Sequence, residues 1–472
     1  MSKKKRVILI ISIGLMGIIL IGLVLSIVTK FWYNPFKGVN MPGFGYYTGY
    51  TKVLSPDEIK EDLRQLKTDL AEVHPATMDG LPPELEAAFA AAGQINREMT
   101  VGKFSLIVSE LVCMLGDAHT SVHLGVADLH LPIGIKVIDN KFYVLGGRNL
   151  NPGDELLSLG GVATEDIMAF AKQVIPAENP YWRNHLIASV LTQSALTQMG
   201  AEINEKRRID AEIRRNGETI VVPLEFGFAY DIPQPSQDKE FYPSNSAEYG
   251  YYLDQENSIC HFKLSECNYT EDYIQFLKTM FRDIKDNRIE NIIVDLRGNP
   301  GGNSQVVNEF LKYIDTEDYK SYCYTRRMSR AAAEQRGYII NWGSVTYKHC
   351  IRKNSRAEGL IFAGQIYALI DNGTFSSGNY FGVILADNGI GTIIGEPSGN
   401  APNCYGDTLY FQLKNSKLIY SISYTQWMRP NLDRAEDDAL YPHYPVTFTI
   451  DDYINQRDLA MEEALRLIQG GN

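Results

Sequence analysis

The sequence predicts an α/β protein with a helical N-terminal segment, a small separate module and one membrane-spanning helix. Three observations carry this prediction. An uncharged apolar run fills Val7–Val28. Apolar residues then recur at helical spacing over Ser55–His74 and after Thr100. From Tyr251 onward, apolar strands alternate with amphipathic helices, which is typical of parallel strands covered by helices.

The N-terminus predicts a membrane anchor. Basic residues at positions 3–6 precede Val7–Val28, and only Lys30 follows closely. A helix of this length spans roughly 30 Å, the thickness of the hydrocarbon core, and the basic flank keeps the N-terminus in the cytoplasm. A cleaved signal peptide is the alternative, although no Ala-x-Ala site follows. We expect a single-pass protein of the cell membrane with an extracytoplasmic catalytic domain.

Composition excludes some partners. A net charge of −12 argues against nucleic acid and against tight binding to anionic lipid surfaces. The six cysteines lack CxxC spacing and form no zinc signature. In an outward-facing domain, Cys323 and Cys350 could close one inserted loop.

We divide the chain into four segments. Short strand-like runs, helices over 165–174 and 185–199, and a hairpin signal at Asn216-Gly217 mark a separate module. A basic stretch, Arg326–Arg356, interrupts the later alternation and is interpreted as a surface insertion. The segments are 1–30 (cytoplasmic stub and transmembrane signal anchor), 31–130 (linker and helical segment), 131–228 (module) and 229–472 (α/β core).

Ser376 is the first candidate for chemistry. In Gly-Thr-Phe-Ser-Ser-Gly it lies where an apolar strand turns sharply into a helix. Its hydroxyl would then be exposed above a sheet edge, near the positive end of a helix dipole. Nucleophilic serines are often presented in this way. A serine that only caps the helix is the alternative.

A glycine loop is the second candidate. Asp295–Asn303, DLRGNPGGN, follows a buried strand and opens a helix. The consecutive glycines Gly301 and Gly302 allow backbone N–H groups to point at a negative oxygen. The loop matches neither a Walker loop nor a dinucleotide fingerprint. A tight strand–helix turn without a ligand is the alternative.

Taken together, these motifs resemble a known family. IVDLRGNPGG and TFSSGNYFGVILADNGIGTIIGEPSG are similar to the C-terminal processing (tail-specific) serine peptidases and their tricorn-core relatives. The resemblance extends back to LGDAHTSV and His74, and forward to a proline stretch near Pro442. It implies a crotonase/ClpP-like α/β catalytic core, Ser376 as nucleophile, and neither a cofactor nor a metal.

The resemblance also nominates a base. Many family members use a lysine beyond the nucleophile, at a place that corresponds here to Ala401, but no lysine occurs between Ser376 and Lys414. The branch that resembles the tricorn core uses a histidine, and its motif matches LGDAHT, which nominates His119. A histidine suits general base catalysis near neutral pH. Ala118 stands where tricorn-like enzymes have a supporting serine.

The same pattern suggests the remaining parts of the site. It nominates Glu436 as the acid that holds His119, with Asp437 as the alternative. Backbone N–H groups of Gly301 or Gly302 and of Ser377 would stabilise the oxyanion. Separately, GDELLSLGG over 153–161 resembles part of a PDZ domain, which binds peptides by strand addition. Residues 131–228 are therefore interpreted as a PDZ-like module.

The expected function is that of a membrane-anchored extracytoplasmic serine peptidase acting on proteins or peptides through Ser376, His119 and Glu436. The alternative is a non-catalytic peptide- or lipid-binding protein at the cell surface, because the fold also resembles repeats of interphotoreceptor retinoid-binding protein.

Overall fold

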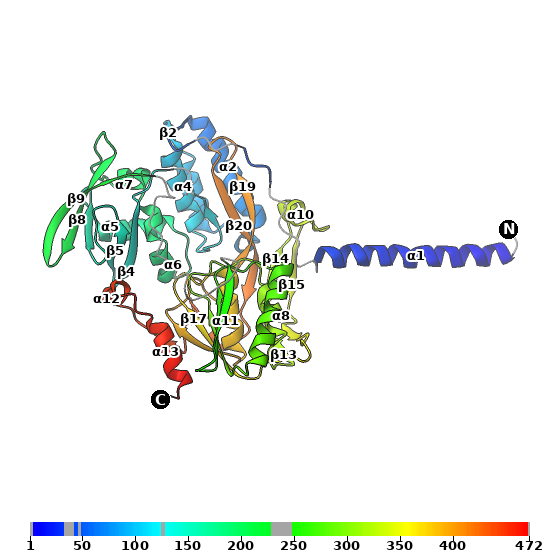
Figure 1. Ribbon diagram of the computed structural model, residues 1–472. Helices are drawn as coiled ribbons and strands as arrows, with labels where there is room; N and C mark the ends of the chain where they lie inside the picture. Colours follow the sequence, from blue (N-terminus) through cyan, green and yellow to red (C-terminus); the bar gives the residue numbers. More distant parts are fainter. Residues whose placement is uncertain (1–2, 33–41, 46–48, 124–127, 228–247, 471–472) are drawn as a thin grey trace.

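The computed structural model describes residues 3–32, 42–45, 49–123, 128–227 and 248–470 (Figure 1). The N-terminal helix α1 (Lys3–Trp32) projects from the body of the molecule. Within the described residues, no helix is both long and apolar enough to cross a membrane. Part of Val7–Val28 lies outside the residues whose side chains are described, which in α1 are 5–6 and 12–25. The anchor stays a prediction.

The helical segment that follows forms as predicted. Ser55 and Glu58 make a capping box at the start of α2, and the Thr100 side chain caps α4. Apolar faces of these helices share a core with one face of a later sheet, through residues such as Leu66, Phe104 and Tyr420. The elements are β1 (Val53–Leu54), α2 (Pro56–Val73), η1 (Pro75–Thr77), α3 (Pro83–Ala92), β2 (Met99–Thr100), α4 (Val101–Cys113) and β3 (Ser121–Val122).

The predicted module has its own sheet and core. Its strands pair in the order β4-β5-β6-β8-β9, with β7 beside β6, and the hairpin at Asn216-Gly217 has positive φ at both residues, as a two-residue turn requires. The elements are β4 (Ile133–Ile138), β5 (Lys141–Gly147), β6 (Glu155–Leu159), β7 (Val162–Ala163), α5 (Thr164–Val174), α6 (Pro180–His185), η2 (Ile187–Val190), α7 (Gln193–Gln198), β8 (Arg208–Arg215) and β9 (Glu218–Glu225).

One prediction in this module is wrong. Residues 185–199 are not a single helix but the end of α6, the short turn η2 and α7. Leu191 leaves the helical conformation, and the Thr192 side chain accepts a hydrogen bond from the Ala195 N–H and so caps a new helix. The likeness to a PDZ domain stays a prediction, and the predicted boundary at 228 lies outside the described residues.

A six-stranded sheet forms the centre of the α/β core, in the order β10-β11-β12-β17-β18-β21. All neighbours are parallel except the hairpin of β10 and β11. The elements are β10 (Tyr249–Asp254), β11 (Ile259–Leu264), α8 (Glu271–Asp286), β12 (Asn291–Asp295), α9 (Gln305–Leu311), β17 (Gln365–Ile370), α11 (Ser376–Asp387), β18 (Thr392–Gly395) and β21 (Tyr444–Pro445).

Successive side chains of the central sheet pack into two different hydrophobic cores, one on each face of the sheet. Ile292 and Val294 of β12 pack in the large core formed with α8, α9 and α11, whereas Ile293 packs with α13 on the other face. A sheet buried on both faces explains the continuous apolar run that predicts β12. The helices that close the chain are η4 (Leu432–Arg434), α12 (Ile450–Ile454) and α13 (Leu459–Ile468).

A second sheet, β15-β14-β20-β19 with β3 beside β20, carries the basic insertion. Cys323 and Cys350 form a disulfide, with Cα atoms 5.3 Å apart. The insertion is more than a solvated face, because Arg326 binds Asp407 and Arg327 donates to the backbone oxygen of His74. The elements are β13 (Asp318–Lys320), β14 (Cys323–Arg327), α10 (Arg330–Arg336), β15 (Ser344–Tyr347), β16 (Ile351–Lys353), β19 (Cys404–Gln412) and β20 (Ile419–Met428).

Candidate active site

Parallel pairing brings the two sequence motifs together. Asp295 at the end of β12 pairs with Leu369 of β17, so the loops that leave both strands emerge at the same sheet edge. The Phe375 N–H donates to the Asn299 backbone oxygen at 2.8 Å, and the Thr374 hydroxyl donates to the Leu296 oxygen at 3.0 Å. These bonds fix the serine turn against the glycine loop.

Ser376 is the first residue of α11 and has a φ of 51°. A positive φ is uncommon for a residue other than glycine and costs of order 1–3 kcal/mol. Part of the compensation is local, since the Ser376 N–H donates to Asn400 Oδ1 at 2.9 Å. The sharp turn is therefore built into the fold and resembles the nucleophile elbow of serine hydrolases.

The glycine loop meets the serine at Gly301. A Cβ at this position would lie 2.5 Å from Ser376 Cβ and 2.8 Å from Ser377 N. Of the predicted oxyanion donors, Gly301 already donates its N–H to Asn299 Oδ1 at 2.8 Å. The N–H groups of Gly302 and Ser377 have no acceptor among the described residues, so these two are open to a substrate oxygen.

Substitution of Gly301 tests this close approach. We expect Gly301→Ala to lower kcat by about 10²–10³-fold, the usual effect of losing an oxyanion donor, because the new methyl group displaces the Ser377 N–H. The measurement is steady-state hydrolysis of a peptide substrate. Gly298→Ala is the matched control: its φ is also positive, at 69°, but a Cβ there meets nothing within 4 Å. Equal losses in the two variants would contradict the argument.

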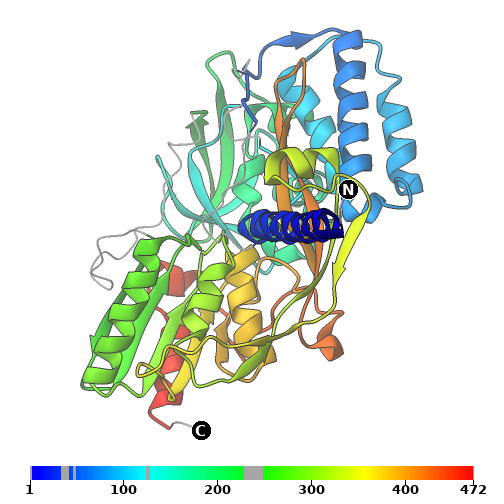
Figure 2. The same ribbon diagram turned by 90° about the vertical axis from the view of Figure 1, so that its right-hand side faces the viewer.

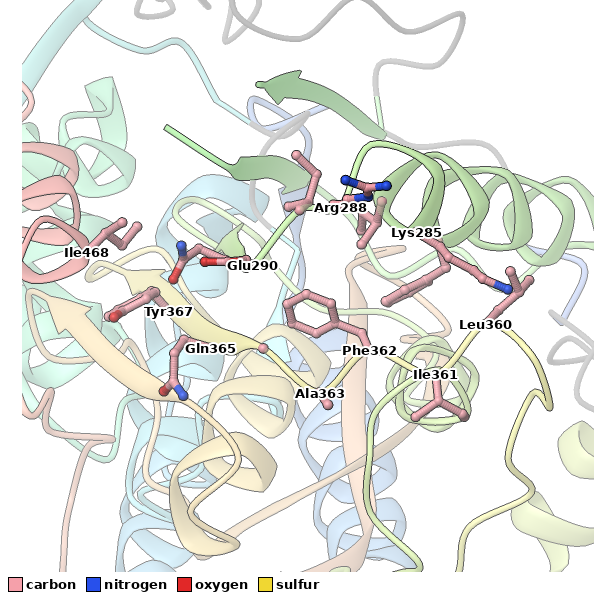
Figure 3. A pocket seen from close by; sticks show the side chains of 15 residues that line it. Lys285, Arg288, Glu290, Leu360, Ile361, Phe362, Ala363, Gln365, Tyr367 and Ile468 are labelled. Carbon is pink, nitrogen blue, oxygen red and sulfur yellow. The ribbon is translucent and has the colours of Figure 1, made fainter. Parts of the chain in front are cut away.

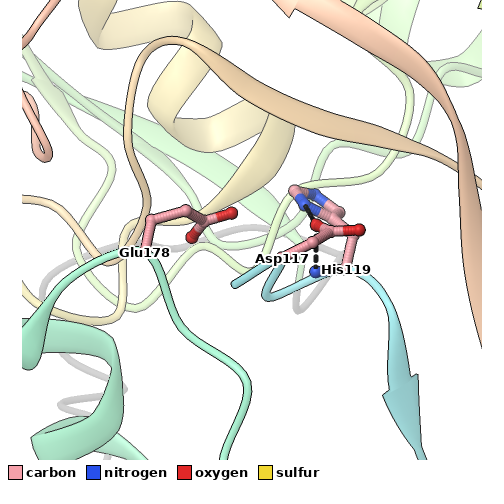
Figure 4. Close-up of side chains that lie close together, drawn as sticks. All are labelled: Asp117, His119 and Glu178. Carbon is pink, nitrogen blue, oxygen red and sulfur yellow. Dashed lines mark hydrogen bonds and ion pairs between the residues drawn. The ribbon is translucent and has the colours of Figure 1, made fainter. Parts of the chain in front are cut away.

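Two acidic side chains, Asp117 from the same turn and Glu178 from the module, lie beside the predicted base His119 (Figure 4). His119 follows α4, and its ring packs on the Phe375 ring with centroids 4.5 Å apart. It therefore lies against the residue that precedes Ser376. Asp117 Oδ1 accepts a hydrogen bond from the backbone N–H of His119 at 3.0 Å and lies 3.8 Å from the ring atom His119 Nδ1. One donor atom each from Asp117, His119 and Glu178 all lie within 4.8 Å of one another.

Asp117 is the most strongly held of the three. Its buried carboxylate accepts hydrogen bonds from Thr120 Oγ1 at 2.5 Å and from His74 Nε2 at 3.1 Å. His74 Nδ1 accepts the Ala76 N–H, so its proton is on Nε2 and points at Asp117. Burial by itself raises the pKa of Asp117, but the hydrogen bond from His74, together with attraction to the His74 and His119 rings when these are protonated, holds this pKa well below its usual range. Asp117 is therefore a fixed negative charge beside His119.

His119 and Glu178 are both neutral near pH 7. Burial lowers the pKa of His119 despite the charges of Asp117 and Asp407, which keeps the imidazole free to accept a proton. Burial, and then the charge of Asp117, raises the pKa of Glu178 to about 8. Glu178 Oε1 accepts the Ala118 N–H at 3.2 Å. Its Oε2 and His119 Nδ1 are buried without a hydrogen-bond partner among the described residues.

The raised pKa of Glu178 predicts a pH-dependent stability. A carboxyl group with a higher pKa in the folded state stabilises fully below its ordinary pKa of 4.5, and this contribution is lost as the pH rises toward about 8. We expect Glu178→Gln, which stays uncharged, to gain free energy of unfolding relative to the parent between pH 5 and 8, by at least about 1.4 kcal/mol, one pKa unit. Urea unfolding of both proteins measures the difference. Glu436→Gln, at an exposed carboxylate, should show no such trend.

The acids nominated from the sequence lie elsewhere. Glu436 is exposed, and no hydrogen bond or ion pair joins it to His119 in the described part of the chain. Asp437 instead binds Arg429 at 3.0 Å and Arg434 at 2.8 Å. Asp117 and Glu178 are the carboxyl groups beside His119, and sequence reasoning missed both. Asp117 could have been found from the sequence, since it lies two residues before His119 in the same motif. No sequence pattern points to Glu178, which comes from the module.

The same three groups form a set that could hold a metal ion. Two carboxylates and one imidazole suit a divalent cation, but the oxygens of Asp117 already accept hydrogen bonds from His74, Thr120 and the His119 N–H. This arrangement fits the orientation of His119 better than it fits metal ligation.

A cavity of 560 Å³ lies at the amino ends of the central strands, opposite the ends from which the Ser376 turn and the glycine loop emerge (Figure 3). Asn291 and Gln365, the first residues of β12 and β17, line it together with Phe362 and Glu290. In parallel sheets, ligands bind at the carboxyl ends of the strands, where Ser376 lies. The cavity is therefore separate from the candidate active site.

Comparisons with known proteins agree with this architecture. Residues 259–446 match the model of peptidase family S41. Among solved structures, mature CPAF in complex with lactacystin is similar to this chain with a TM-score of 0.65 and 16% identity, over 88% of this chain and 99% of CPAF. Another structure of mature CPAF gives a TM-score of 0.64 and 15% identity, over 88% and 98%. No curated protein matches the sequence.

The family match covers the glycine loop, the serine turn and the strands that place them at one sheet edge. The likeness to CPAF shows that the shared fold extends over most of the chain. Residues 259–446 therefore form a domain that matches peptidase family S41, and the protein is a serine-type peptidase.

Proposed function

We propose that the chain is a membrane-anchored, extracytoplasmic serine peptidase in which Ser376 is the nucleophile and His119 the general base. The observation that carries the proposal is the convergence of three features. Ser376 has a strained backbone above the glycine loop, the His119 ring packs on Phe375 beside it, and the buried Asp117 carboxylate lies next to His119. The use of histidine corresponds to the branch that resembles the tricorn core.

In the proposed mechanism, neutral His119 accepts the Ser376 proton as Oγ attacks the peptide carbonyl. The N–H groups of Gly302 and Ser377 stabilise the oxyanion that forms. Asp117 stabilises the imidazolium, which then donates its proton to the leaving amine. Water hydrolyses the acyl-enzyme with His119 again as base. We propose Asp117 for the role that the sequence pattern gave to Glu436.

Two features support an outward-facing, anchored protein. The described apolar side chains of α1 are exposed, as at Met16 and Ile18, and would be buried by lipid. Disulfides such as Cys323–Cys350 persist mainly in oxidising compartments. The proposal includes a PDZ-like module at 131–228, whose sheet has edge strands that could add a peptide strand.

A fluorophosphonate probe tests the nucleophile. We expect the purified protein to be labelled on Ser376 and the Ser376→Ala and His119→Ala variants to remain unlabelled. Ser377→Ala is the control, because the Ser377 hydroxyl donates to the Gly302 backbone oxygen at 2.8 Å and is not free to attack. Mass spectrometry of the labelled peptide identifies the serine. A folded protein that stays unlabelled from pH 5 to 9 would overturn the catalytic proposal in favour of a non-catalytic binding protein.

A further inference from the structure

The basic insertion carries an unexplained apolar surface. In the loop Tyr338–Gly343, which follows α10, Ile339 is 73% exposed, Ile340 47% and Trp342 78%. Three large apolar side chains this exposed within four residues are unusual for a protein surface in water, and such clusters mark binding sites. The loop is far from Ser376 in sequence, and the proposed mechanism does not use it.

This loop lies on the side of the molecule from which α1 emerges. In both views α10 lies beside the end of α1 (Figures 1 and 2). Pro42, Gly43 and Phe44, which resume the described chain after α1, line one groove with Ala331 and Glu334 of α10. The residues between Trp32 and Pro42 can span at most about 36 Å in any conformation. A bilayer around α1 would therefore be within reach of the loop.

The charge around the loop is opposite to that of the whole chain. Residues 330–353 contain five basic residues and one acidic residue, in a protein with a net charge of −12. Lys348 and Lys353 are exposed. The disulfide between Cys323 and Cys350 ties together the two ends of the segment that carries the loop, so the apolar and basic groups stay on one part of the surface.

We propose that the loop Tyr338–Gly343 inserts into the headgroup region of an anionic bilayer, the membrane that holds α1. The inference rests on the proposed membrane anchor. Tryptophan favours the membrane interface, because its ring is apolar while its N–H still meets water. Ile339 and Ile340 would be buried at the acyl boundary, and the exposed Lys348 and Lys353 would bind anionic headgroups. The loop and α1 together would hold the peptidase body in one orientation on the membrane.

The test uses the full chain in vesicles of phosphatidylglycerol and phosphatidylcholine, with and without brominated acyl chains. The chain has four tryptophans, so the fluorescence of Trp342 is isolated as the difference between the parent and Trp342→Phe. We expect brominated lipid to quench this difference signal by at least about twofold. Ile339→Ser/Ile340→Ser should reduce the quenching. Leu432→Ser, which removes another exposed apolar side chain, should leave it unchanged.

Flotation of the same vesicles at alkaline pH measures the anchor separately. A chain that floats while Trp342 remains unquenched would overturn the docking of the loop and leave the anchor intact. A chain that does not float would overturn both. Sedimentation in detergent measures whether the chain forms a dimer. If the parent is a dimer and Trp342→Ser is a monomer, a second copy of the chain, and not lipid, covers the loop.

Discussion

Ser376→Ala should lose about 10⁶-fold in kcat, and His119→Ala should lose nearly as much, because the nucleophile and its base act as one unit. The double variant should be no slower than either single variant. In the proposed mechanism, His119 serves only to move the Ser376 proton, so removing His119 from a protein without that hydroxyl should have no further effect. Steady-state hydrolysis of a fluorogenic peptide at high enzyme concentration measures all three.

The non-additivity is the decisive part of this experiment. If the two losses multiplied in the double variant, His119 would act independently of Ser376 and the base would be another group. Circular dichroism provides the control for folding. Ser376→Ala should keep the parent spectrum, because the Ser376 hydroxyl is not among the hydrogen bonds that hold the turn.

Arg429→Ala should lower the free energy of unfolding by about 3–5 kcal/mol, the usual cost of leaving a buried partner charge unpaired. The Arg429 side chain is fully buried, and it binds both oxygens of Asp387, which is 1% exposed, at 2.6 and 3.1 Å. Asp387 is the last residue of α11, the helix that begins at Ser376. The pair therefore holds the C-terminal end of α11 in place.

Denaturant unfolding measures this loss, and a surface pair supplies the control. Arg466 binds Glu463 with similar geometry, but its side chain is 42% exposed. Arg466→Ala should cost less than about 1 kcal/mol, because solvent screens the exposed pair. Similar losses in the two variants would show that burial does not govern the Arg429 pair.

Much of the fold could be predicted because its signals are local. The capping box at Ser55, the apolar run of β12 and the turn residues Asn216-Gly217 each act on neighbours in the chain. The continuous helix predicted over 185–199 failed because Thr192 makes a local cap that interrupts it. A cap of this kind competes with helical periodicity, and the apolar spacing alone does not reveal which prevails.

By itself, the sequence determined the serine turn, the glycine loop, the absence of the family's lysine and the nomination of His119. Each depends on a short motif whose residues stay together in the chain. Only the tertiary structure decided which carboxyl groups surround His119. Asp117 is held in place by His74, which is distant in sequence, and Glu178 comes from the module at 131–228. Glu436 had the expected spacing in the chain, but it lies at the surface, because contacts between distant segments depend on packing rather than on spacing.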